Sequence, residues 1–198
     1  MSSRLFLLSF FGALLLQISG CNRAIDEVNL VQKEGVYFKS GSNQPYSGDI
    51  VAYYASGEVE SKFSLKEGVR QGLFQMFFKD GRLYIESNYS KGIRNGKYRD
   101  YYANGRLKSD HEFKMGEAVM SESFRETGEL FYRETAIGEK TRLHEWFYED
   151  GSQNYTYTTK MGVKSGLYLE FDEYYGGIKH RECYKEGTKV DIVMCDSE

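Results

Sequence analysis

Apolar and polar side chains alternate along short segments of this chain, and glycine turns separate the segments. In one segment Phe74, Met76 and Phe78 occupy every second position, with Gln75 among the residues between them. Side chains that alternate in this way point to opposite faces of a strand, so each segment predicts a β-strand. One face is the more apolar, and we expect the strands to stack through it. In the first strands of the repeats it carries Ile50, Ala52, Tyr54, Phe74, Met76, Phe78, Tyr98, Asp100, Tyr102, His144, Trp146 and Tyr148.

The alternating segments recur with a period of 24 residues, marked by Gly48, Gly72 and Gly96. Self-similarity at a fixed period of this size is typical of a repeat array, in which each unit is buried by its neighbours. Two further glycine series follow the same period closely, namely Gly57, Gly81, Gly105, Gly128 and Gly151, and Gly68, Gly92, Gly116, Gly138 and Gly162. The predicted units are 48–71, 72–95, 96–119, 120–141, 142–165 and 166–189, and the fourth is two residues short.

Each unit is predicted to contain two strands and two turns. Asn104-Gly105 lies between two strand-like segments and predicts a type I′ turn, which needs positive φ at both central residues. We expect the other turn of each unit to be looser, as at 67–72. The chain is therefore predicted to be all-β, an elongated and twisted antiparallel array of tandem hairpins that forms a single-layer open sheet over residues 35–189. Residues 190–198 predict a last strand and a tail.

The first twenty residues have the build of a secretory signal peptide. Arg4 is followed by an apolar stretch from Leu5 to Leu16, which is too short to span a bilayer. The sequence Ile18-Ser19-Gly20-Cys21 resembles the lipobox of bacterial lipoproteins. That resemblance implies cleavage before Cys21 and lipidation of Cys21; the alternative is a plain signal peptide with an incidental cysteine. Residues 21–34 are largely polar without a clear period and predict a tether.

Composition narrows the class of protein further. The chain has 17 Tyr, 13 Phe and 21 Gly but one Pro, as expected of strands joined by glycine turns. Its formal net charge of −3 leaves no basic stripe for nucleic acid, so we expect no nucleic-acid partner. Cys183 and Cys195 are the only cysteines after Cys21. In an oxidising envelope they can form a disulfide, and the alternative is two independent, half-buried thiols.

A finer pattern recurs within the units. In the third unit Gly96, Tyr98, Tyr101, Tyr102, Asn104, Gly105, Leu107 and Lys108 spell Gly-x-Tyr-x-x-Tyr-Tyr-x-Asn-Gly-x-Leu-Lys. This pattern, with a lysine-rich glycine turn near position twenty of the unit, resembles the bacterial MORN-repeat-variant family, whose members are widely labelled YwqK-family antitoxins. The lead-in from Tyr37-Phe38 to Pro45-Tyr46-Ser47-Gly48 also looks like members of that family. The resemblance implies an elongated hairpin array that acts as a binding scaffold.

Residues typical of catalysis are scattered along the sequence. His111, His144 and His180 fall in different units at different offsets, without metal-ligand spacing. The serines lack a Gly-x-Ser-x-Gly elbow, and the glycine turns do not open helices that would cradle phosphate. We therefore expect a protein that is not an enzyme and that uses no metal or cofactor.

Two features are candidates for binding. The first is an aromatic row on the less apolar face, flanked by polar residues, of the kind that an extended groove for peptide or glycan would use. The alternative is that these rings stack on one another and stiffen the sheet. The row consists of Tyr53, Phe77, Tyr101 and Phe147, with Arg99, Gln75 and Glu145 beside it. The second is a basic loop series, Arg70, Arg94 and Lys164, which would touch anionic lipid or lipopolysaccharide phosphate or else be solvated loop charge.

Three functions remain open at this level. The first is a monomeric, lipid-anchored protein of the bacterial cell envelope that binds a protein or another envelope macromolecule through its repeat surface. Asn22, in place of an aspartate after the lipidated cysteine, favours the periplasmic side of the outer membrane or the cell surface. The second is an antitoxin or immunity protein, and the third is an enzyme that acts on envelope polymers.

Overall fold

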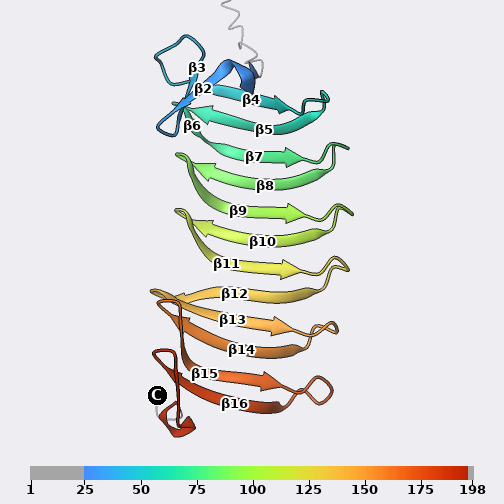
Figure 1. Ribbon diagram of the computed structural model, residues 1–198, viewed down its shortest axis with the longest axis vertical. Coiled ribbons are helices and arrows are strands. Elements are labelled where there is room, and N and C mark those ends of the chain that lie inside the picture. Colours follow the sequence, from blue (N-terminus) through green and yellow to red (C-terminus); the bar gives the residue numbers. More distant parts are fainter. Residues whose placement is uncertain (1–24, 196–198) are drawn as a thin grey trace, which may run out of the picture.

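A computed structural model describes residues 25–195. Its main feature is a 15-stranded open sheet in which successive hairpins are stacked along the long axis of the molecule (Figure 1). The strands of this sheet are β1 (Ile25–Asp26), β4 (Gly48–Tyr53), β5 (Val59–Lys66), β6 (Val69–Arg70), β7 (Gly72–Phe77), β8 (Leu83–Ser90), β9 (Ile93–Tyr101), β10 (Leu107–Lys114), β11 (Glu117–Phe124), β12 (Leu130–Gly138), β13 (Thr141–Phe147), β14 (Gln153–Lys160), β15 (Val163–Phe171), β16 (Ile178–Lys185) and β17 (Thr188–Val190). A separate two-stranded sheet consists of β2 (Leu30–Lys33) and β3 (Val36–Lys39), and two 3-10 helices are η1 (Glu27–Asn29) and η2 (Ile192–Met194).

The repeat prediction is confirmed at the level of tandem hairpins. Each predicted unit contains one antiparallel hairpin, and the hairpins follow one another across the sheet in sequence order. Three short strands that the repeat did not predict, β1, β6 and β17, complete the sheet, and β1 pairs in parallel with β4. The six hairpins are β4–β5, β7–β8, β9–β10, β11–β12, β13–β14 and β15–β16.

The type I′ turns and the looser turns lie at opposite ends of the hairpins from those predicted. At Asn104-Gly105 only the glycine has positive φ, and Tyr102 and Arg106 close a loop of three residues by a backbone hydrogen bond of 2.8 Å. A three-residue loop that ends in a left-handed glycine is the common alternative to type I′. The type I′ geometry lies instead at turns such as Lys91-Gly92, where φ is 50° and 80° and Ser90 pairs directly with Ile93. The predicted looser turns are therefore the tight ones.

Gly96, a member of the first glycine series, lies in a β-bulge. On β9 the pairing with β8 shifts by two residues between Tyr89↔Arg94 and Ser87↔Tyr98, and Gly96 lies in the shifted stretch with φ 101°. A bulge of this kind commonly places a glycine at positive φ and bends the strand. In the fourth unit, which is two residues short, the β10–β11 and β12–β13 pairings each shift by only one residue.

Backbone hydrogen bonds join each unit to the next at the type I′ end of the hairpins. The turn glycines Gly92 and Gly116 donate to the carbonyl oxygens of Arg70 and Arg94, both at 2.9 Å. A side chain repeats the link, since the Gln71 Oε1 accepts from the backbone N–H of Lys91 at 2.9 Å. Neighbouring units therefore align through their turns as well as through strand pairing.

A tyrosine links the units at the opposite end of the hairpins. The hydroxyl of Tyr54 donates to the carbonyl oxygen of Phe77 at 2.6 Å, and the hydroxyl of Tyr102 donates to that of Phe124 at 2.7 Å. The fifth unit repeats the bond from Tyr148 to Phe171 at 3.2 Å. In each case the acceptor lies in the next unit, so the tyrosine that corresponds to Tyr102, the last of the repeat pattern, connects adjacent hairpins.

Removing one of these hydroxyls is expected to weaken the array. Tyr102→Phe should lower the free energy of unfolding by about 0.5–1.5 kcal/mol, the net value of one such hydrogen bond. The second unit offers the reverse test, because Phe78 stands at the tyrosine position without a hydroxyl. Phe78→Tyr should raise stability by a similar amount, as measured by urea unfolding. Equal stability of Tyr102→Phe and the wild type would contradict the proposed link.

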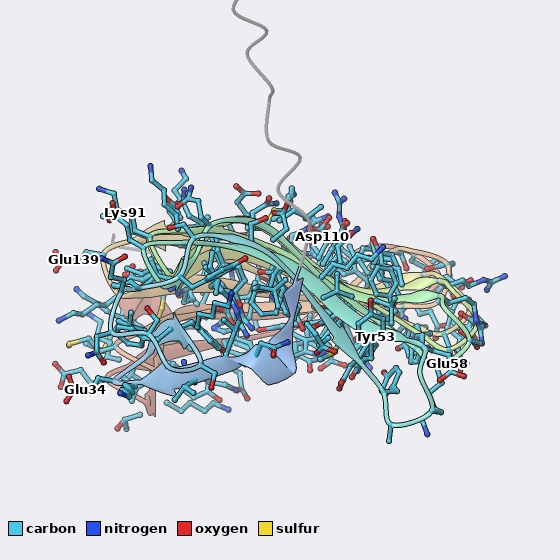
Figure 2. All side chains as sticks on the ribbon, turned by 90° about the horizontal axis from the view of Figure 1, so that it is seen from above. Glu34, Tyr53, Glu58, Lys91, Asp110 and Glu139 are labelled. Carbon is cyan, nitrogen blue, oxygen red and sulfur yellow. A yellow bond between two sulfur atoms is a disulfide. The ribbon has the colours of Figure 1, made fainter. Side chains whose placement is uncertain are left out.

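The two faces of the sheet differ as the alternation predicts. The inner face carries Ile50, Phe63 and Leu65, which are all at most 4% exposed and form the core at the N-terminal end. Burying each such side chain stabilises the fold by about 1.5–3 kcal/mol. Viewed from above, the sheet is arched, with the β2–β3 hairpin under the arch and Asp110 on the outer side (Figure 2). Among the described residues no second layer covers the inner face beyond this hairpin.

The tether predicted over residues 21–34 is wrong for its described part. Residues 25–33 form β1, η1 and β2, and β2 pairs with β3 to make the small hairpin that covers the core. Leu30 and Tyr37 pack against the core cluster, which explains why this polar segment is ordered. The backbone N–H of Tyr37 donates to the Gly68 carbonyl oxygen at 2.8 Å and fixes the hairpin to the first repeat.

The C-terminal segment differs in part from the predicted last strand. A strand does complete the sheet, but it is β17, which ends at Val190, and the apolar residues that follow form η2. The Asp191 side chain accepts a hydrogen bond from the Val193 backbone N–H and begins that helical turn. A disulfide joins Cys183 on β16 to Cys195, which excludes two independent thiols in this structure.

Candidate binding surfaces

The aromatic row predicted from sequence lies on the outer face but does not form a continuous surface. Tyr53, Phe77, Tyr101 and Phe147 each pair with a residue of their own return strand, such as Phe77 with Leu83. Among residues 25–195 no ring contact joins one of the four to another. The self-stacked ladder is therefore wrong, because successive members belong to hairpins and are separated by a return strand.

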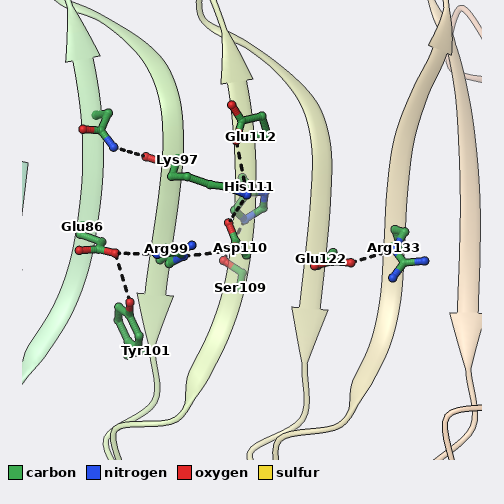
Figure 3. A network of polar contacts seen from close by, with 11 residues as sticks. Glu86, Lys97, Arg99, Tyr101, Ser109, Asp110, His111, Glu112, Glu122 and Arg133 are labelled. Carbon is green, nitrogen blue, oxygen red and sulfur yellow. Dashed lines mark hydrogen bonds and ion pairs between the residues drawn. The ribbon is translucent and has the colours of Figure 1, made fainter. Parts of the chain in front are cut away.

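Charged side chains fill the outer face beside these rings. Strand register places Glu86, Arg99, Asp110, Glu122, Arg133 and Glu145 directly opposite one another across six strands. Figure 3 shows this row from Glu86 to Arg133. The predicted binding residue Arg99 lies 3.1 Å from Asp110 and 3.3 Å from Glu86, measured between ion-pair atoms. Its hydrogen bond to Asp110 raises the pKa of Arg99 above its usual value. The guanidinium is thus held by the protein's own carboxylates.

A larger aromatic cluster, which the sequence analysis did not single out as a site, lies on the inner face. Trp146 contacts Tyr155 with ring centroids 4.7 Å apart and planes 15° apart, and His144 contacts Tyr157 at 4.7 Å and 19°. Rings stacked across strands about 4.8 Å apart stand on the sheet, so they present mainly their edges and hydroxyls to a partner. This inner aromatic cluster consists of Tyr132, His144, Trp146, Tyr155, Tyr157 and Tyr168.

Hydrogen bonds hold the middle of the inner aromatic cluster. The hydroxyl of Tyr132 lies 2.9 Å from Glu134 Oε2 and from His144 Nδ1, and His144 Nε2 lies 2.9 Å from Thr159 Oγ1. Burial, followed by the hydrogen bond to Glu134, raises the pKa of Tyr132 strongly. Burial lowers the pKa of His144 below its usual value, although Glu134 opposes that shift. A neutral imidazole is therefore favoured within the cluster.

Acidification is expected to destabilise the fold through its half-buried histidines. Burial lowers the pKa of both His144 and His111, so between the lowered value and about 6.5 the unfolded chain binds more protons than the folded one. Stability should fall as the pH decreases from about 7 through that window. His144→Gln should make the dependence shallower in urea unfolding at a series of pH values. An unchanged slope in that variant would contradict the assignment.

A second polar group lies in the centre of the inner face. The Ser109 hydroxyl donates to Asp100, and His111 Nε2 lies 2.8 Å from the same hydroxyl. Lys108 pairs with the other Asp100 oxygen at 3.4 Å. Here serine lies between histidine and carboxylate, whereas in a catalytic triad the histidine lies between serine and carboxylate. The arrangement satisfies buried polar groups, since Asp100 and Ser109 are 8% and 9% exposed.

The basic series predicted as loop charge lies over aromatic rings of the inner face. The Arg70 guanidinium carbon is 4.9 Å from the Phe74 ring centre, and that of Arg94 is 4.8 Å from Tyr98. The Lys164 ammonium is 4.9 Å from the centres of both Tyr168 and Tyr184. Cations over ring faces gain about 0.5–2 kcal/mol each. The three residues therefore lie on β6, β9 and β15 and pack on rings, which corrects their assignment to loops, while Arg94 is exposed to solvent.

Metal and membrane features can be stated for residues 25–195 only. Within that range no group of three or more His, Cys, Asp or Glu side chains is arranged to hold a metal ion. The helices in it are also too short to cross a membrane. The predicted signal peptide and the lipidation site Cys21 lie outside the described residues.

The chain matches no known family model and no curated protein.

Proposed function

We propose that this protein is a non-catalytic, lipid-anchored scaffold of the bacterial cell envelope that binds another macromolecule through the inner face of its sheet. The observation that carries this proposal is the inner aromatic cluster, which no second layer covers among the described residues. Large aromatic side chains beside charged residues are typical of protein interfaces. The proposal includes membership of the MORN-repeat-variant family, which the period, the glycine pattern and the stacked hairpins support.

The inner face is preferred over the outer face for a physical reason. On the outer face Arg99 and Arg133 are engaged in internal ion pairs, so a partner would have to break those pairs to use them. On the inner face the rings of Trp146 and Tyr155 are half-buried, and the indole N–H of Trp146 and the hydroxyl of Tyr155 are polar groups that can pair with a partner backbone. Because stacked rings offer edges more than faces, a protein partner fits this surface better than a sugar ring lying flat.

Affinity capture from an envelope extract tests the proposal. Trp146→Ala with Tyr155→Ala should lose the captured partner, whereas Phe77→Ala with Tyr101→Ala should retain it. Circular dichroism of both variants checks that the sheet is intact. Retention by the inner-face variant, or loss by the outer-face variant alone, would reject the inner face as the binding surface. In the same cells Cys21→Ser should move the protein from the membrane fraction to the soluble fraction, and an unchanged distribution would reject the lipid anchor.

An immunity function is the second candidate. It rests on the sequence resemblance to proteins labelled as antitoxins, and the lipobox restricts it to a toxin that reaches the envelope. Deletion of the gene should then make cells sensitive to a toxin encoded beside it. If cells that lack the gene show no toxicity, the immunity function is rejected.

A further inference from the structure

Two arginines on the inner face share one tyrosine and lack a carboxylate partner. Arg70 lies on β6 and Arg94 on β9, at equivalent positions of neighbouring units. Arg94 Nε donates to the Tyr89 hydroxyl at 3.4 Å, and the Arg70 guanidinium carbon lies 5.5 Å from the Tyr89 ring centre. The ion pairs found within residues 25–195 involve neither arginine. Two positive charges therefore meet at one phenol without a carboxylate from the described part of the chain to neutralise them.

Arg70 is also partly removed from water. Its guanidinium lies over Phe63 and Phe74, 5.3 and 4.9 Å from the ring centres, and its Nε is buried without a hydrogen-bond acceptor. A buried N–H donor without an acceptor costs free energy, which a bound anion would recover. A guanidinium that packs on rings by its face still has its N–H groups in the plane free to bind an anion. Burial alone would raise the pKa of Tyr89, but Arg94 and Arg70 outweigh it and lower that pKa. The site thus has an unmatched positive potential.

The space beside Arg70 is a polar hollow. It lies between the N-terminal hairpin and the type I′ turns, and Gln32 and Tyr37 contribute polar side chains to its wall. Val69 and the backbone at Gly35 and Gly92 complete the lining. An incoming group can therefore reach Arg70, which lines this hollow, without displacing a strand.

Arg142 is the second residue of β13, as Arg70 is of β6 and Arg94 is of β9, and in this sense it occupies the equivalent position. Unlike those two arginines, it has a carboxylate partner. Arg142 donates from Nη1 to the Ala118 carbonyl oxygen, and its Nε lies 3.8 Å from Glu134 Oε1. Arg142 therefore has both a hydrogen-bond acceptor and a carboxylate, while Arg70 and Arg94 have no carboxylate. Among residues 25–195 Lys164 also occurs in no ion pair, so the absence of a carboxylate is shared by the basic series Arg70, Arg94 and Lys164 and is not a property of every repeat.

We propose that Arg70, Arg94 and Tyr89 bind a phosphate monoester of the partner. Two guanidinium forks and one hydroxyl match the oxygens of a phosphate dianion, whose charge balances the two arginines. The inference rests on the proposed function in that it assigns the ligand to the inner face. It names the chemical group that this end of the face recognises.

Binding of defined phosphates to the purified chain tests the site. The probes are inorganic phosphate, glycerol 3-phosphate, and phosphatidylcholine vesicles with and without phosphatidic acid, whose headgroup is a phosphate monoester. Calorimetric titration should show saturable binding of at least one phosphate probe, and the comparison of soluble and vesicle probes identifies its source. Arg70→Gln and Arg94→Gln should each weaken binding about tenfold or more, as expected for the loss of a charge-assisted hydrogen bond.

Arg142→Gln is the matched control, because it removes the same charge from the equivalent position. It should leave phosphate affinity within about twofold of the wild type, since Arg142 lies on β13, four strands from β9, and charges that far apart are largely screened by salt. Arg94→Lys should recover only part of the affinity, because lysine keeps the charge but loses the fork. Absence of saturable binding to every phosphate probe, or equal weakening by all three glutamine variants, would overturn the proposal. If a partner is captured and the capture is unaffected by Arg70→Gln and Arg94→Gln, the phosphate site is rejected and the proposed binding function stands. If phosphate binds but no partner is captured, the phosphate site stands and the proposed binding function is rejected.

Discussion

Gly68→Ala is expected to lower the free energy of unfolding by about 2–5 kcal/mol. Gly68 has φ +76°, and a Cβ built there would lie 2.3 Å from Val36 Cγ1 and 2.8 Å from the Tyr37 carbonyl oxygen. The second atom is backbone, so the N-terminal hairpin has to move. That movement would disturb the 2.8 Å hydrogen bonds that Gly68 makes with Tyr37 and Tyr46. Urea unfolding measures the loss, and hydrogen exchange should show it concentrated in β2 and β3.

Gly162→Ala separates steric overlap from backbone strain. Gly162 occupies the same turn position with φ +83°, but a Cβ there meets nothing within 4 Å. The left-handed conformation alone costs an L-residue about 1–2 kcal/mol. Gly68→Ala should therefore be the more damaging of the two. Equal losses would show that the contact with the N-terminal hairpin contributes nothing.

Loss of the Cys183–Cys195 disulfide is expected to destabilise the C-terminal hairpin by about 3 kcal/mol, from the chain entropy of a loop of this length. The bond spans 12 residues and holds η2 against the last hairpin, whose outer strand β17 pairs with β16 at only three positions. Cys195→Ser is the suitable change, because Cys183 is 1% exposed and a serine hydroxyl there would be buried. Hydrogen exchange should become faster in β16 and β17 before it does so in the central hairpins, since an array of repeats is stabilised unit by unit.

The wild type under reducing conditions is the control for Cys195→Ser. Both should show the same early exchange at the C-terminal end, because both lack the same bond. Tyr102→Phe, which acts between central units, should leave exchange at β17 unchanged. An unfolding curve of Cys195→Ser that superimposes on that of the oxidised wild type would contradict a stabilising role for the disulfide.

The candidate site was only partly predictable from the sequence. The alternation distinguished the two faces correctly, and it placed Trp146 and His144 together on the inner one. It could not show that Tyr155 and Tyr157 of the return strand lie opposite them, because that contact depends on the β13–β14 register. The outer row is predicted as a binding site because aromatic side chains recur there beside polar residues on the less apolar face. Residues one repeat apart lie two strands apart, so that regularity does not bring their rings into contact.

The turns show the same limit at the level of the backbone. Asn104-Gly105 has the residues that a type I′ turn favours, yet the type I′ turns form at pairs such as Lys91-Gly92 and Met115-Gly116. Both turns contain glycine, and the strand pairing decides which loop has two residues and which has three. Local preference for positive φ is worth about 1 kcal/mol, which is less than the pairing of two whole strands contributes.

The order and period of the glycines and the alternation of side chains were enough to determine that this protein is a row of tandem antiparallel hairpins with one more apolar face. These are properties of neighbouring residues, and the physics of a strand depends on them directly. Register, bulges and the packing of residues 25–39 were decided only by the tertiary structure. They settle which charges are neutralised, as for Arg99 and Arg142, and which are left without a carboxylate, as for Arg70 and Arg94. Such pairings join side chains that are distant along the chain, and no local pattern encodes the distance between them.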